Sequence, residues 1–86
     1  MAEVGARELE ALVERAIQLL PVRLRVPLVL RTLQGLSYDE VAEATGVTAA
    51  TARTNVMQAR RALSSRLAAH LQSEEDRDDS FGGNLG

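Results

Sequence analysis

Residues 37–48 hold two helix-start signals with a glycine between them, and this arrangement constrains the fold more than any other feature. Ser37 and Glu40 form an S-x-x-E capping box, in which each side chain bonds the backbone N–H of the other residue, so a helix begins directly after Ser37. Gly46 interrupts that helix, because glycine takes a tight turn without a Cβ penalty. Thr48 is a favourable N-cap for the next helix. The sequence therefore predicts a helix-turn-helix.

Two further segments before this pair repeat apolar residues at helical spacing. Pro21 separates them, since a proline ends one helix or opens the next. The second segment, 22–33, contains Pro27, which has no N–H to donate, so we expect a kink or a late helix start there. Gly35 is expected to end that helix. The stripe of the first helix consists of Leu9, Leu12, Val13, Ala16, Ile17 and Leu20.

The expected fold class is all-α, a small four-helix domain containing a helix-turn-helix, over residues 7–71. Of the 86 residues, 45% are hydrophobic and only 2% aromatic, so Leu, Val and Ala must build the core, which suits packed helices. Residues 1–6 are expected to form a flexible N-terminus. Residues 72–86 are polar, acidic and glycine-rich and are expected to be a disordered acidic tail. The apolar set of the final helix, predicted to end near Leu71, is Ala52, Val56, Ala59, Leu63 and Leu67.

Charge is divided unevenly along the chain. Residues 1–71 contain nine arginines and seven acids, which give +2, whereas residues 72–86 contain five acids and one arginine, which give −4. No acid occurs between Glu43 and Glu74, although four arginines do. A carboxylate on an exposed helix face would repel a phosphate backbone, and arginine would bind it. The acid-free helix therefore indicates contact with nucleic acid.

The polar side chains of this final helix gather opposite its apolar ones. Because the face carries Thr, Gln and Arg and no acid, we predict that it enters a major groove between two phosphate rails. The N-terminal part of a recognition helix usually meets the base edges. The predicted DNA-binding residues are Thr51, Arg53, Thr54, Asn55, Gln58, Arg60 and Arg61.

Position along the helix separates two roles within this set. Arg53, Thr54 and Gln58 are predicted to approach bases. Arg53 is the best single candidate, because a bidentate Arg–guanine pair is a common specific contact. The arginines further along are expected to contact the DNA backbone: Arg60, Arg61 and Arg66.

These residues also resemble a known family, region 4 of bacterial RNA polymerase sigma factors, particularly the extracytoplasmic-function type. The resemblance covers roughly residues 9–67. It implies that the final helix recognises the promoter −35 element in double-stranded DNA, and that the domain docks on the flap of the polymerase β subunit. Because Leu and Val crowd residues 20–33, we also expect the first two helices to leave an apolar surface that receives the flap or a competing anti-sigma factor. The matching features are Leu20-Pro21, Arg23, Leu28-Val29-Leu30-Arg31, Gly35-Leu36-Ser37-Tyr38, Glu40, Ala42, Gly46-Val47, Thr51 and Ala59-Arg60-Arg61-Ala62-Leu63.

Three departures from the family pattern bear on function. The family often has basic residues where this chain has Asn55 and Gln58, so affinity or base preference is expected to differ. Pro27 falls in a helix that the family usually continues. Region 2, which melts the −10 element, has no counterpart in these residues, so the sequence is either an excised domain or a stand-alone region-4 protein.

Two other functions are compatible with the pattern. The output domain of a response regulator shares the helix-turn-helix spacing, but it lacks the Leu-Pro start and the Ala-Arg-Arg-Ala-Leu ending found here. A region-4-like interaction module would bind polymerase or an anti-sigma factor without reading DNA. A promoter-DNA binding assay at low and moderate salt would discriminate this module from a DNA-binding domain, because DNA affinity falls steeply with salt.

Several function classes are not expected. His70 is the only histidine, there is no cysteine, and no paired carboxylates stand at the spacing of a catalytic site, so we expect no enzyme, no cofactor and no metal. No apolar run approaches the ~20 residues that span a bilayer, and no signal-peptide pattern opens the chain. We expect a soluble cytoplasmic protein without a membrane segment.

Overall fold

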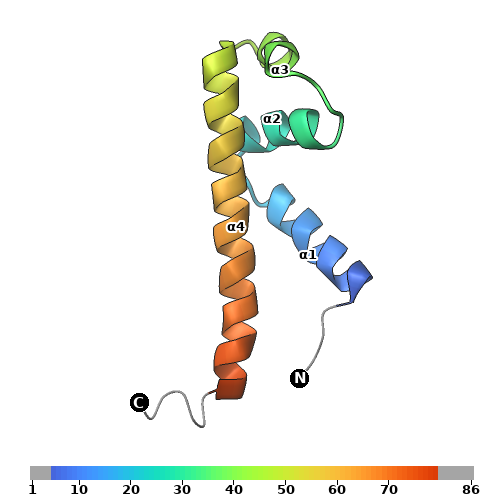
Figure 1. Cartoon of the computed structure of the whole chain (residues 1–86), viewed down its shortest axis with the longest axis vertical. Helices are drawn as coiled ribbons and strands as arrows, with labels where there is room; N and C mark the ends of the chain where they lie inside the picture. Colours follow the sequence, from blue (N-terminus) through green and yellow to red (C-terminus); the bar gives the residue numbers. More distant parts are fainter. Residues whose placement is uncertain (1–4, 80–86) are drawn as a thin grey trace.

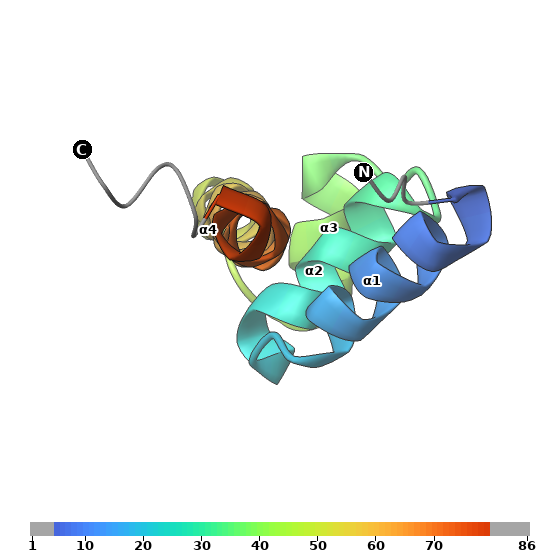
Figure 2. The same cartoon turned by 90° about the horizontal axis from the view of Figure 1, so that it is seen from below.

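The structure is a computed structural model that describes residues 5–79, with side chains described for residues 5–70. Four α-helices make up this part of the chain: α1 (Ala6–Gln18), α2 (Val22–Thr32), α3 (Tyr38–Thr45) and α4 (Ala49–Asp79). The long helix α4 forms one side of the molecule, and the three short helices lie along its other side (Figures 1 and 2). The predicted all-α, four-helix fold is confirmed.

The junction between α1 and α2 is a short turn that still contributes to the core. Leu20 was predicted to be the last residue of the apolar stripe of the first helix. Helix α1 ends at Gln18, so Leu20 lies just beyond it. Leu20 is nevertheless buried, and Pro21 occupies the N-cap position of α2 with an extended ψ of 149°. Proline therefore opens the second helix, one of the two roles that the sequence left open.

Pro27 does not delay the start of α2. The helix begins at Val22 and continues through Pro27, so the expected late start is wrong. The missing N–H of Pro27 removes one hydrogen bond to the first turn of the helix, and Pro27 is one of the buried residues of α2. After the helix ends at Thr32, Gly35 takes a φ of 72°, the left-handed region that favours glycine.

Both helix-start signals of the helix-turn-helix are confirmed. The hydroxyl of Ser37 accepts a hydrogen bond from the N–H of Glu40 at 3.1 Å, and the N–H of Ser37 donates to the Glu40 carboxylate at 2.8 Å. Gly46 ends α3 with a φ of 73°. Two residues later, the Thr48 hydroxyl accepts from the N–H of Thr51 at 3.1 Å and caps α4.

The core consists of two clusters that share helix α4. The apolar face of α4 meets α2 in one cluster and α3 in the other, and the small alanines on α4 allow close approach of the shorter helices. Ala52, Val56 and Ala59 have no exposed surface. The larger cluster contains Leu20, Leu24, Leu28, Val56 and Ala59, and the smaller contains Val41, Ala42 and Ala52.

Helix α4 is longer than expected. It continues to Asp79, so its predicted end near Leu71 is wrong, whereas the disorder expected for the acidic tail as a whole remains a prediction. The polar composition predicted disorder, but no glycine or proline stands between Ala49 and Asp79 to stop the helix. Residues 1–4 and 80–86 lie outside the described residues, so the predictions of flexibility made for them remain predictions.

Candidate nucleic-acid interface

The N-terminal half of α4 exposes nearly all the residues predicted to contact DNA. Their exposure follows from the packing just described, because the opposite face of the helix is sealed against α2 and α3. Asn55 is the exception: it is 9% exposed and lies against α2, although the sequence placed it beside the open face. The exposed members of the predicted set are Thr51, Arg53, Thr54, Gln58, Arg60 and Arg61.

The first turn of α4 is organised by its capping threonine. Besides accepting the N–H of Thr51, the Thr48 hydroxyl donates to the Thr51 hydroxyl oxygen at 3.0 Å. The hydroxyl hydrogen of Thr51 is left to donate outward. No acidic residue stands in this turn, so the positive end of the helix dipole is not neutralised by the helix itself. This end of α4 is suited to a phosphate or another anionic group.

Arg53 does not extend freely into solvent. Its guanidinium lies over the ring of Tyr38, 5.0 Å from the centroid, and the guanidinium of Arg31 lies over the same ring at 4.5 Å. Arg31 also donates from Nη1 to the backbone oxygen of Leu36 at 2.9 Å. Since Tyr38 packs on the larger core cluster, this stack joins α2, α3 and α4 and orients Arg53.

A second arginine reaches the same helix from α2. Arg23 donates from Nη1 to the side-chain oxygen of Gln58 at 3.1 Å and, at the limit of hydrogen-bond distance, to that of Asn55 at 3.5 Å. Arg23 was not among the residues predicted for a site, because it is 32 and 35 positions from Asn55 and Gln58 and no local pattern joins them. Asn55 thus serves the contact between α2 and α4.

The arginines of this surface keep their charge available. Among the residues whose side chains are described, no carboxylate lies within ion-pair distance of Arg23, Arg53 or Arg60. Their partners are an aromatic ring, amide oxygens or solvent. A surface with several guanidinium groups and no paired carboxylate attracts anions. Because most of these groups lie along one helix, the surface suits a nucleic-acid groove.

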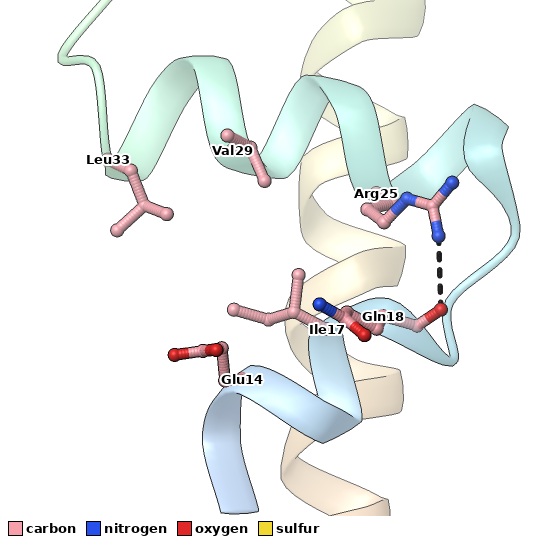
Figure 3. A pocket seen from close by; sticks show the side chains of 6 residues that line it. All are labelled: Glu14, Ile17, Gln18, Arg25, Val29 and Leu33. Atoms are coloured by element: carbon pink, nitrogen blue, oxygen red, sulfur yellow. Dashed lines mark hydrogen bonds between the residues drawn. The ribbon is translucent and has the colours of Figure 1, made fainter. Parts of the chain in front are cut away.

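A groove of about 400 Å³ lies on another part of the molecule, between α1 and α2 (Figure 3). Ile17 of α1 faces Val29 of α2 across it, and Leu33 stands at one end with 70% of its surface exposed. At the other end, Arg25 donates from Nη1 to the backbone oxygen of Gln18 at 3.0 Å. The lining residues are Glu14, Ile17, Gln18, Arg25, Val29 and Leu33.

Other kinds of site have little support in the described residues. They contain no group of three or more His, Cys, Asp or Glu side chains that could hold a metal ion. The single histidine, His70, is exposed and lies in the C-terminal half of α4. Within the same part of the chain, no helix is long and apolar enough to cross a membrane.

Comparison with known proteins gives a consistent set of relatives. Residues 10–63 match the family described as Sigma-70, region 4. The chain is 40% identical over 60 residues to the RNA polymerase sigma-H factor of Pseudomonas aeruginosa, covering 70% of this chain and 31% of the relative. It is 37% identical over 62 residues to the ECF RNA polymerase sigma-E factors of Escherichia coli K12 and Salmonella typhimurium LT2, covering 72% and 32%. The chain thus spans about a third of the length of these relatives.

Proposed function

The chain belongs to the sigma-70 region 4 family, of the extracytoplasmic-function type, and from this membership we propose that it recognises the −35 element of bacterial promoters. The observation that carries the proposal is the exposed face of α4, which holds threonine, glutamine and arginine side chains and no acid from Ala49 onward through the capped first turns. Such a face suits the major groove, where base edges lie between two rows of phosphates.

Two contact classes are proposed on this face. Arg53, Thr54 and Gln58, in the first turns of α4, read base edges. Arg60 and Arg61, further along the helix, hold phosphates. Thr51 contributes a hydroxyl donor near the helix start, where the dipole favours an anion. The proposed function needs no catalytic step, cofactor or metal. The ligand is promoter DNA in the cytoplasm.

The test begins by selecting a preferred duplex from a randomised library with the 86-residue chain. Affinity for that duplex and for a scrambled duplex is then titrated at several salt concentrations. We expect tighter binding to the selected duplex and a steep loss of affinity with salt for both, since each phosphate contact releases counterions. Equal affinity for the two duplexes at every salt concentration would refute sequence recognition and leave the interaction-module hypothesis standing. The response-regulator hypothesis loses its support, because the family match is to sigma factors.

The groove between α1 and α2 supports a second part of the proposal, docking of the domain on the β flap of RNA polymerase or on a competing anti-sigma factor. Three of its six lining residues are aliphatic, and one of these, Leu33, presents 70% of its surface to solvent. Further apolar side chains on α2 and in the turn before it are also exposed, an arrangement typical of an interaction surface. The exposed neighbours are Leu19, Val22 and Val26.

Binding of the isolated β flap tests this docking. Leu33→Glu places a carboxylate at the mouth of the apolar groove, close to Glu14, and should reduce flap binding at least tenfold, because burying an unpaired charge is costly. Met57→Glu is the matched control. Met57 is an exposed apolar residue as well, with 52% of its surface accessible, but it lies on α4 and does not line the groove. Unchanged flap binding by Leu33→Glu would rule out this groove as the docking site.

A further inference from the structure

Arg23 stands on α2 but its guanidinium lies at the DNA-facing surface of α4. Nη1 is 3.1 Å from the side-chain oxygen of Gln58, a residue of the exposed face, and 3.5 Å from that of Asn55. A guanidinium only donates hydrogen bonds, so both amides must turn their oxygens toward it. Arg23 is itself exposed and occupies the first turns of α2.

This placement fills a gap in the charge of the recognition helix. Between Arg53 and Arg60 the helix carries no cation, because positions 55 and 58 are an asparagine and a glutamine. Arg23 brings a positive charge from α2 to this interval, beside both amides. With Arg23, the surface has a cation between Arg53 and Arg60, which α4 alone does not provide.

The charge of Arg23 is not consumed inside the protein. Its hydrogen-bond partners are neutral amides, and no carboxylate lies within ion-pair distance among the described side chains. Nη1 makes the contacts to α4, which leaves the donors on Nη2 and Nε for another partner. An arginine serving only to join two helices would gain more from an acidic partner, because charge-assisted hydrogen bonds are roughly twice as strong as neutral ones.

We propose that Arg23 is a DNA-phosphate contact of this domain, delivered by α2 to the place where α4 carries Asn55 and Gln58. The inference rests on the proposed recognition of DNA by α4. The contact also fixes Gln58 with its oxygen toward Arg23 and its NH₂ group outward. Gln58 then offers donors to the DNA and cannot make the bidentate pair with adenine, which needs its oxygen as well.

The test compares Arg23→Met with Arg7→Met on the selected and scrambled duplexes. Both variants lose one positive charge, but Arg7 is in the first turn of α1 and contacts no residue of α4 through a hydrogen bond in the described structure. For Arg23→Met we expect about tenfold weaker binding to both duplexes, and a salt slope lower by about 0.9, the value of one phosphate contact. Arg7→Met should leave the salt slope unchanged.

A second substitution tests the position of the charge. Gln58→Arg in the Arg23→Met background returns a guanidinium to the same place from the α4 side and should restore most of the lost salt slope. In the wild-type background the same substitution puts two cations side by side, so its gain should be smaller. If Arg23 and an arginine at position 58 share one phosphate, their effects on the salt slope should be non-additive. Additive effects would indicate two independent phosphate sites.

The outcomes distinguish this inference from the proposed function. If the wild-type chain binds the selected and scrambled duplexes equally, sequence recognition fails. If the wild type discriminates and the salt slope of Arg23→Met equals that of Arg7→Met, only the role of Arg23 is overturned. Should Arg23→Met unfold in the assay, Arg23→Gln keeps a donor toward Gln58 and removes the charge alone, and the same loss of slope is expected.

Discussion

At the residue scale, the interface depends on how its arginines are held. Long cationic side chains lose conformational freedom on binding, and an arginine already oriented loses less. Tyr38 orients Arg53 through its ring, and Gln58 orients Arg23 through its amide oxygen. Neither contact neutralises the arginine concerned. The surface is therefore both ordered and cationic, which favours binding to a fixed array of phosphates and base edges.

Arg53 and Arg61 are expected to differ in what they contribute. Arg53→Ala should relax the preference among −35 variants, because a bidentate Arg–guanine pair provides about 1–3 kcal/mol of discrimination. Arg61→Ala, the matched control on the same helix face, should weaken the selected and scrambled duplexes alike and lower the salt slope by about one contact. Both are measured by titration at several salt concentrations. Equal losses on both duplexes for Arg53→Ala would mean that Arg53 is not the reading residue.

Tyr38 is predicted to act through Arg53. Tyr38→Leu removes the ring under the guanidinium and should reduce discrimination between the two duplexes a few-fold, since a cation–π contact at an exposed site is worth about 0.5–1 kcal/mol. Tyr38→Phe keeps the ring and should behave like the wild type. The salt slope should stay unchanged in both variants, because no cation is lost. If Tyr38→Phe loses as much discrimination as Tyr38→Leu, the hydroxyl matters and the stacking explanation is wrong.

At the scale of elements, the turn between α3 and α4 sets the angle at which the interface is presented. Gly46 has a φ of 73°, a conformation that side-chain-bearing residues rarely adopt. A Cβ at this position meets no atom within 4 Å, so the cost of adding one is conformational rather than steric. The helix-turn-helix thus depends on glycine for its backbone and not for space.

Gly46→Ala should lower the free energy of unfolding by about 1–2 kcal/mol, the cost of a left-handed alanine. The matched control is Gly5→Ala: the N-cap Gly5 of α1 has a φ of −69°, so the substitution carries no left-handed penalty there and should lower the free energy of unfolding by less, about 0.5 kcal/mol from the poorer N-cap. Urea denaturation followed by circular dichroism measures both. A loss at Gly46 no larger than that at Gly5 would show that the turn can adopt another conformation.

Local rules account for the parts of these elements that the sequence predicted. A capping box needs only Ser37 and Glu40, and a left-handed turn needs only Gly46, so each could be read from a few adjacent residues. The burial of Asn55 and the reach of Arg23 depend on how α2 crosses α4, and spacing within one helix carries no information about that crossing. The end of α4 was predicted too early, because the acidic composition after Leu71 predicted a stop although no glycine or proline stands there before Asp79.

At the scale of the whole molecule, helix α4 serves as the common support for two separate surfaces. Its buried side packs the short helices, and its exposed N-terminal half carries the cationic face. The groove lies between α1 and α2 and is lined by no residue of α4 (Figure 3). Since the two surfaces use different side chains, the proposed DNA contact and the proposed protein docking do not compete for the same residues.

The most direct test of this account is the location of the DNA on the protein surface. Backbone amide chemical shifts of the isotope-labelled chain are measured by NMR as the selected duplex is added. Shifts are expected at Thr51, Arg53, Gln58 and Arg61 of α4 and at Arg23 of α2, with α1 unaffected. Shifts confined to α1 and to the groove, with the exposed face of α4 unchanged, would contradict it.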